Sequence, residues 1–170
     1  ARPDYTRTIL NASFGYFWKS PGHLHTSHTL NPLEVNMIQV PYKDEDFLEN
    51  VTNPYIINSY KNQLIVALNY NVVFDTKSEK ERINRQYIRL GLETSGNLLE
   101  AMSGFLPQDP DDNFHRVLGI QYSQYLKSDI DFRWYRRLDD QNRMAYRLFA
   151  GVIYPYGNAE GSSPFIKKYY

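Results

Sequence analysis

The sequence predicts an all-β protein, and within that class a transmembrane antiparallel β-barrel built from about six long amphipathic strands. Three observations lead to this prediction. Apolar and polar residues alternate with a period of two over long runs, aromatic residues make up 15% of the 170-residue chain, and short connections alternate with long ones. An α-helix, with a period of 3.6 residues, would scatter the apolar residues around its surface.

Six runs carry the alternation. In the third run Leu68 and Val72 alternate with Asn69 and Asn71, so one face is apolar and the other polar. The runs cover residues 6–18, 33–40, 63–74, 86–98, 118–134 and 142–154. A barrel strand needs about 9–11 residues to cross a bilayer, and most of the runs reach that length.

The connections predict which ends of the strands lie together. Residues 138–142 form a tight polar turn rich in Asp and Asn, whereas the connections at 41–61 and 99–115 are long. Outer-membrane barrels have short periplasmic turns and longer external loops. We therefore expect the linkers at 19–32 and 75–84 on the periplasmic side. Residues 44–51, with helical spacing and acidic residues at their start, predict a short helix in the first long loop.

Aromatic residues lie near the ends of the runs. Tyr and Trp combine an apolar body with a polar tip, which suits a membrane–water boundary. The residues expected in such a girdle are Tyr16, Trp18, Phe74, Trp134, Tyr135, Tyr154 and Tyr156.

Composition argues against several other classes of protein. The 19 basic residues balance the 19 acidic ones, which removes the usual electrostatic argument for nucleic-acid binding. There is no cysteine, hence no disulfide and no thiol nucleophile. No run of about 20 apolar residues predicts a membrane helix, and residues 1–5 do not resemble a signal peptide, so we expect an upstream segment. No phosphate loop or nucleophile elbow occurs, and we expect neither enzyme activity nor a cofactor.

One histidine cluster is a candidate metal site. His23, His25 and His28 place three imidazoles within six residues, a set that could bind zinc or copper. Because no cysteine or nearby carboxylate completes a ligand set, the sequence favours a polar loop and no metal.

One carboxylate pair is a candidate for acid–base chemistry. Asp129 and Asp131 share the polar face of the fifth run, as paired catalytic carboxylates would. Basic residues surround them, so ion pairs across strands are the predicted role. The basic residues close by in sequence are Lys127, Arg133, Arg136 and Arg137, and Arg143 and Arg147 on the next run are expected to face the carboxylates.

Two other functions fit the same alternation. A different outer-membrane barrel, such as a porin or substrate channel, would have the same strands. A soluble, Tyr-rich β-sandwich that binds glycans would pack the apolar face on a second sheet instead of lipid.

Several segments resemble a known family. The sequence Arg133-Trp-Tyr-Arg-Arg-Leu138, with residues 147–158 and 163–170, resembles the bacterial surface antigen barrel of the BamA/TamA superfamily. Residues 8–18 and 86–99 are also similar to it. The element Leu30-Asn-Pro-Leu-Glu34 resembles the TamL-like branch.

The resemblance implies a sixteen-stranded barrel preceded by periplasmic POTRA repeats, located in the bacterial outer membrane. Such proteins assemble, insert or translocate other outer-membrane proteins without a cofactor. The partners implied are the lipid bilayer, client proteins and assembly-complex subunits. Residues 1–170 would then be one part of a single barrel domain, roughly its sixth to eleventh strands.

The family's characteristic motifs are expected outside this chain. The segment from Pro155 would open the long sixth external loop. A Gly-Gly pair and an Arg-Gly-aromatic motif would follow Tyr170, and the POTRA repeats and remaining strands would lie elsewhere in a longer protein. No functional residue of the family can therefore be carried over to a position here.

A pair of substitutions tests the assignment of faces. Leu68→Arg is expected to cost about 2–4 kcal/mol of unfolding free energy in lipid vesicles, because its face would meet lipid near mid-membrane. Asn69→Arg, on the opposite face, should cost much less. Equal costs would contradict the assignment.

Overall fold

A computed structural model of the chain describes residues 5–21, 25–43, 61–76, 84–108, 114–139, 141–159, 164 and 167–168. They form one antiparallel sheet of six strands in the order β1-β2-β3-β4-β7-β8 and a small β5–β6 ribbon. The all-β, antiparallel part of the prediction is confirmed. β1 and β8 do not pair with each other, so within the described ranges the sheet is open and forms no closed barrel.

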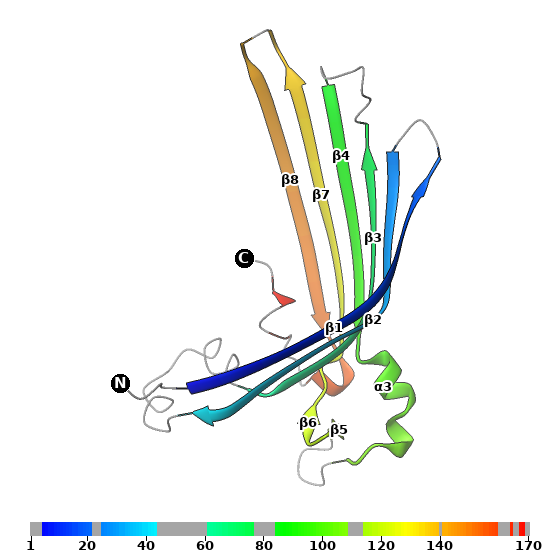
Figure 1. Cartoon of the computed structure of the whole chain (residues 1–170), viewed down its shortest axis with the longest axis vertical. Helices are drawn as coiled ribbons and strands as arrows, with labels where there is room; N and C mark the ends of the chain where they lie inside the picture. The colour runs from blue at the N-terminus through cyan, green and yellow to red at the C-terminus, as the bar shows by residue number, and fades with distance from the viewer. Residues whose placement is uncertain are drawn as a thin grey trace.

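The strands are long and follow one another along the sheet, curving together (Figure 1). Each of the six exceeds the five or six residues of a typical strand. Their bounds are Tyr5–Ser20 for β1, His25–Lys43 for β2, Gln63–Asp75 for β3, Asn84–Ser95 for β4, Tyr125–Arg137 for β7 and Arg143–Pro155 for β8. Because neighbours in sequence are neighbours in space, the three short connections share one end of the sheet and the long ones share the other.

The predicted linker at 19–32 was wrong, because β2 begins at His25 rather than at Leu33. Residues 26–29 are small or polar on both faces, so they carry no apolar alternation, although they pair with β1 and β3. A register shift between Asn31 and Glu34 changes which parity faces each side. Pro32 lies in this shift, where a missing backbone N–H is tolerated.

The predicted end of the fourth run at residue 98 was also wrong. β4 ends at Ser95, where Gly96 has a φ of 80° and leads into the helix α3, Asn97–Ala101. The 3₁₀ helix η1, Ser103–Phe105, follows within the connection expected as a loop.

The fifth predicted run also divides in two. Its first residues form a ribbon of β5, Arg116–Val117, and β6, Ile120–Gln121. Leu118 and Gly119 turn the ribbon with φ values of 52° and 74°, the left-handed pair of a tight hairpin. β7 starts only at Tyr125.

The helix expected at 44–51 lies outside the described residues.

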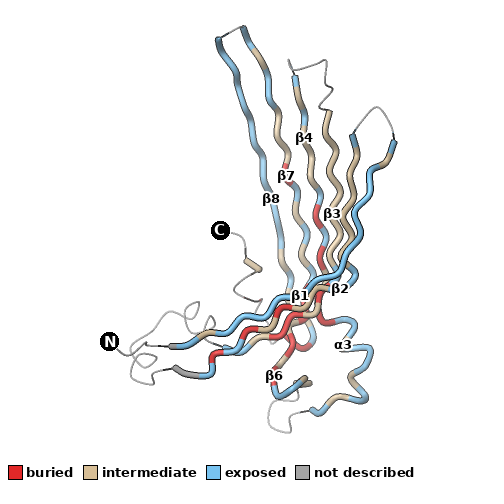
Figure 2. The backbone as a smooth tube through the Cα atoms, viewed as in Figure 1, coloured by how far each residue is buried: buried red, intermediate tan, exposed pale blue. Residues whose placement is uncertain are grey.

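Residues 97–108 and 114–122, which we call the flap, cover one face of the sheet at the end with the long connections. Leu64, Ile120 and Tyr122 are its buried centre. The Tyr122 hydroxyl donates to Glu100 at 2.6 Å. Burial raises the pKa of Tyr122, and this hydrogen bond raises it further. The side chains packed around this centre are Val35, Met37, Val66, Leu99, Leu106 and Val117. Buried residues concentrate at this end of the molecule (Figure 2), where a second cluster of Ile65, Ala67 and Tyr125 is buried on the other face of the sheet.

The tight turn predicted at 138–142 is confirmed. The Leu138 N–H donates to the Asn142 carbonyl at 3.0 Å. The Asp139 carboxylate accepts from the backbone N–H groups of Gln141 at 2.8 Å and Asn142 at 2.7 Å, and from the Asn142 amide. The side-chain hydrogen bond of Asn142 and then the two backbone donors lower the pKa of Asp139.

Acidification should loosen this turn. Since the folded pKa of Asp139 is lowered, its contribution is fully present above the unfolded value near 3.9 and is lost as pH falls through the folded pKa. Hydrogen exchange of the Gln141 and Asn142 amides should therefore accelerate below about pH 4, after correction for intrinsic rates. Asp139→Asn, which cannot titrate, should remove this pH dependence. Unchanged dependence in that variant would assign it to another group.

Candidate functional site

The pairing of strands sorts side chains onto two faces. On what we call the polar face, Asn69, Glu93 and Lys127 are in register, and the next row joins Asn71, Gly91 and Asp129. The opposite face, which we call the apolar face, carries the even-numbered residues of β3, β4, β7 and β8. Its rows are Tyr70, Leu92, Ser128 and Val152, then Val72, Leu90, Ile130 and Ala150.

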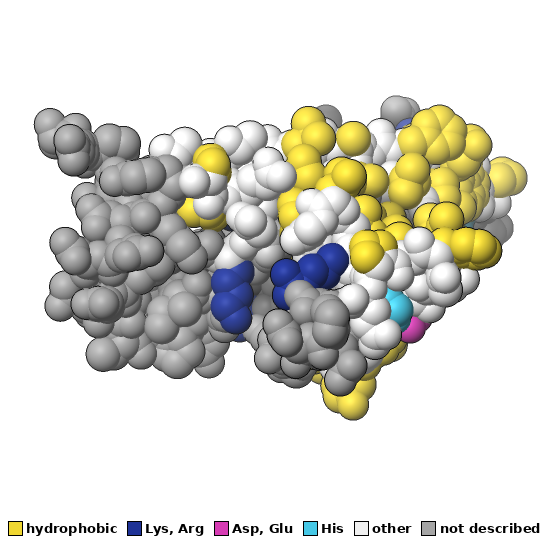
Figure 3. Space-filling model, turned by 90° about the horizontal axis from the view of Figure 1, so that it is seen from below, with side chains coloured by type: hydrophobic (Ala, Val, Ile, Leu, Met, Phe, Trp, Pro, Cys, Tyr) yellow, Lys and Arg dark blue, Asp and Glu magenta, His cyan; other side chains and the backbone are white. Residues whose placement is uncertain are grey.

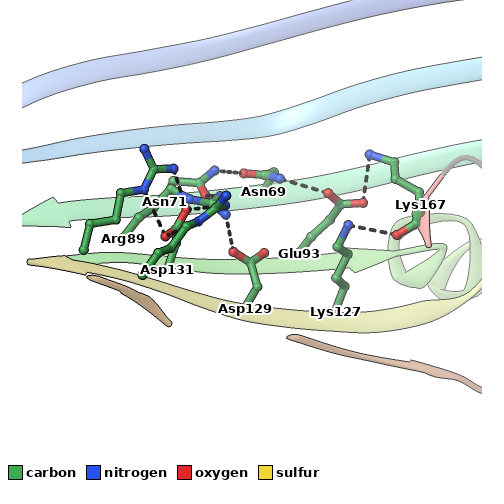
Figure 4. Close-up of polar contacts among 10 residues, drawn as sticks. Asn69, Asn71, Arg89, Glu93, Lys127, Asp129, Asp131 and Lys167 are labelled. Atoms are coloured by element: carbon green, nitrogen blue, oxygen red, sulfur yellow. Dashed lines mark hydrogen bonds and ion pairs between the residues drawn. The ribbon is translucent and has the colours of Figure 1, made fainter. Parts of the chain in front are cut away.

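A chain of hydrogen bonds crosses the polar face (Figure 4). An Arg89 nitrogen lies 2.5 Å from an Asp129 oxygen, and a second donates to Asn71 at 3.3 Å. The Asn71 amide donates to Asn69, which in turn donates to Glu93 at 2.9 Å. Side chains from three strands are therefore connected without a break.

Glu93 is the most buried residue in this series of hydrogen bonds and is only 6% exposed. The Tyr125 hydroxyl donates to it at 2.5 Å, and the Lys167 ammonium lies 2.9 Å away. Lys167 also contacts Glu34 at 2.9 Å, and its carbonyl accepts from Lys127 at 2.9 Å. A residue far along the chain is thus bound directly to the polar face of the sheet.

Lys167 remains a cation in this enclosed position. Burial alone would lower its pKa, but hydrogen bonds to Glu34 and Glu93 and the nearby negative charges outweigh it, so the pKa is raised. An uncompensated ammonium in the same place would be costly. The segment after β8 is therefore anchored by charge pairing.

A second charge cluster surrounds Asp131, which is 2% exposed. Arg133 approaches it at 2.6 Å and Arg147 of β8 at 3.0 Å. Two cations around one buried carboxylate supply the pairing that burial requires. The guanidinium of Arg133 also lies over the Tyr87 ring, 5.2 Å from its centroid.

The predicted ion pairing of Asp129 and Asp131 is therefore confirmed, with corrections to the partners. Arg147 does face Asp131, whereas Arg143 lies opposite Arg137. Sequence reasoning missed Arg89 as the partner of Asp129. The flap separates β4 from β7 in sequence, and nothing in the alternation reveals their register.

Gly91 makes room for the polar chain. A Cβ at this position would lie 2.8 Å from an Asp129 oxygen and 3.1 Å from the Asn71 oxygen. The missing side chain lets Arg89, Asn71 and Asp129 close over the backbone. Sequence indicated only that a glycine within a strand often marks close approach.

The histidines do not form one site in the described residues. His25 pairs with Asp75 and His28 with Val72 in β2, and the odd spacing between them sends their side chains to opposite faces. His23 lies outside the described residues. No group of three or more potential ligating His, Asp or Glu side chains occurs in the part of the chain that the structure describes.

His28 instead joins a polar cluster that sequence reasoning did not find. Its Nε2 lies 3.0 Å from the Ser20 hydroxyl, and its Nδ1 lies 2.8 Å from the Tyr70 hydroxyl. The Trp18 ring stacks on the imidazole with centroids 5.0 Å apart. The residues come from β1, β2 and β3, and with His28 assigned to a linker their pairing could not be anticipated.

Large apolar side chains are exposed over the apolar face. Leu148 is 65% and Val152 63% exposed, and Leu92 and Leu126 are nearly half exposed. Leu68 belongs to the same face, opposite in direction to Asn69. Hydrophobic side chains gather on one side of the molecule when it is seen from below (Figure 3).

Comparison with models of protein families, with curated proteins and with solved structures found no match. Within the described ranges, no helix is long and apolar enough to cross a membrane. The two faces of the sheet are the basis on which function can be argued.

Gly91→Ala should destabilise the protein by about 1–3 kcal/mol, because the new methyl group must displace Asp129 or Asn71 from the hydrogen-bonded chain. Gly104→Ala is the control, since nothing lies within 4 Å of a Cβ there, and it should stay within about 0.5 kcal/mol. Denaturant unfolding measures both. Equal effects would mean that the polar chain tolerates a side chain at Gly91.

Proposed function

We propose that the chain is part of a bacterial outer-membrane β-barrel in which the apolar face meets lipid and the polar face lines the lumen. Its role is non-catalytic. The observation that carries the proposal is the contrast between the faces. Side chains of the polar face are joined by hydrogen bonds and ion pairs. The apolar face exposes large apolar side chains along long strands.

The bare face is too extensive for an ordinary water-exposed surface. Soluble monomers rarely expose apolar patches beyond a few hundred Å². The flap covers the apolar face at one end, over Val35, Met37, Leu64 and Val66. The chain thus covers part of this face itself, and the remainder is suited to lipid.

The length of the bare face also supports this role. On β8 it extends from Tyr146 to Tyr154, eight residue steps or about 27 Å at ~3.4 Å per residue. At the strand tilt of ~35–45° usual in outer-membrane barrels, this length would cover about 20 Å of the ~25 Å apolar band. Tyr146 pairs with Trp134, their centroids 5.8 Å apart, and Tyr154 marks the other end, as an aromatic girdle requires.

The open edges support a larger sheet. β1 and β8 each have a backbone edge that no described strand pairs. In hydrocarbon, unpaired N–H and C=O groups are too costly to persist. We therefore propose that both edges pair with further strands to close a barrel, sixteen-stranded if the family resemblance holds.

The more specific role rests on that resemblance. We propose a barrel of the BamA/TamA type that assembles, inserts or translocates other outer-membrane proteins, with POTRA repeats elsewhere in the protein. The bilayer, client proteins and assembly subunits would be its partners. The anchoring of Lys167 against the polar face is consistent with a segment after β8 that folds into the lumen.

A matched pair of positions tests the lipid-facing assignment. Val72 lies on the apolar face and Val73 on the polar face of the same strand. In a cysteine-free form of the whole protein in bilayers, a fluorophore on Val72→Cys should be quenched by spin-labelled phospholipid and one on Val73→Cys by aqueous iodide. Efficient iodide quenching at both positions would contradict a lipid-facing side.

A further inference from the structure

The cluster of Ser20, His28 and Tyr70 is unusual because its polar atoms lie on the apolar face. By strand pairing, Ser20 shares a row with Phe74, His28 with Val72, and Tyr70 with Leu92, and all three rows lie on the apolar face. All three are partly buried, and Trp18 covers the imidazole. Polar groups facing hydrocarbon are costly, so a group placed there is expected to have a role.

A count of hydrogens indicates what the cluster can bind. In neutral imidazole one ring nitrogen donates and the other accepts. If Nδ1 donates to Tyr70, then Ser20 donates to Nε2 and the Tyr70 hydrogen is left over. If Nε2 donates to Ser20, the Ser20 hydrogen is left over instead. Among the described residues, either arrangement leaves one hydroxyl donor for an external acceptor oxygen.

A groove begins at the same tyrosine. It encloses about 580 Å³ on the apolar face and runs past Tyr70, Leu92 and Ser128 to Ala150 and Val152. The small side chains of Ser128 and Ala150 lie between larger ones and create the depression. Tyr70 and Ser128 are two strands apart in one row, about 10 Å at ~4.8 Å per strand.

We propose that this surface binds one glycerophospholipid, with a phosphate or ester oxygen accepting from the Ser20–His28–Tyr70 cluster and an acyl chain in the groove. A hydrogen-bond donor at one end of an apolar groove is complementary to an oxygen-bearing head and a hydrocarbon tail. The volume lies within the range of small-ligand sites, ~300–1,000 Å³. This inference rests on the proposed function, since it requires the apolar face to lie in a bilayer.

The position of the cluster agrees with this orientation. Ser20 and His28 lie near the end of the sheet with the short connections, whereas Ser128 is in the interior of β7. A head group at the cluster would therefore lie on the side of the membrane boundary, and its chain would cross the strands along the row from Tyr70 to Ser128 and Val152.

The experiment uses the whole protein in bilayers that contain phosphatidylethanolamine with a photoreactive diazirine near the end of one acyl chain. Cross-links mapped by mass spectrometry should concentrate on β7 and β8 around Ser128. Ala150→Phe fills the groove and should reduce cross-linking there to the level of the surrounding face. Leu148→Phe adds an aromatic ring outside the groove on the same strand and face, and should leave the pattern unchanged.

Tyr70→Phe keeps the ring and removes the hydroxyl, so occupancy of the groove should fall about fivefold, the effect of one hydrogen bond. Even cross-linking over the bare face, equal in the Ala150→Phe and Leu148→Phe variants, would overturn the lipid site. The labels at Val72 and Val73 would still support a lipid-facing side in that case. No cross-linking of any strand would overturn both the site and the proposed function.

Discussion

The carboxylates of Glu93, Asp129 and Asp131 lie on one face of a single sheet, and the rest of the structure depends on their neutralisation. Each is held by a cation from another part of the chain, respectively Lys167, Arg89 and Arg147, with Arg133 assisting at Asp131. A slip of one residue between strands would send these charges to the opposite face. The pairing of charges therefore specifies the register, and the register determines which face is left bare.

The alternation of residues was sufficient to predict six antiparallel strands, their two faces and the tight turn at Asp139, because all of these depend on local pattern. It failed where the backbone departs from a regular strand. At Gly96 and Gly119 the backbone adopts positive φ, so the alternation continues in the sequence while the strand does not. At Pro32 the reverse holds, because the strand continues through a register shift where the alternation is lost.

The polar network was predictable only in part. Asp129 and Asp131 with nearby arginines indicated ion pairs, since those residues share one strand. The contributions of Arg89 and Lys167 depend on contacts between segments 40 or more residues apart in the chain. The Ser20–His28–Tyr70 cluster was missed for the same reason, and because the apolar face was not expected to carry polar side chains.

The central claim is that one sheet separates lipid from water, and the edge strand β8 tests it most directly, since most of its side chains are exposed on both faces. A fluorescent label would be moved residue by residue from Arg143 to Tyr154 in the whole protein in bilayers. Lipid quenching should peak at Met144 and every second residue after it, and aqueous quenching at the positions between. Uniform access to the aqueous quencher along the strand would contradict the account and favour a water-soluble sheet.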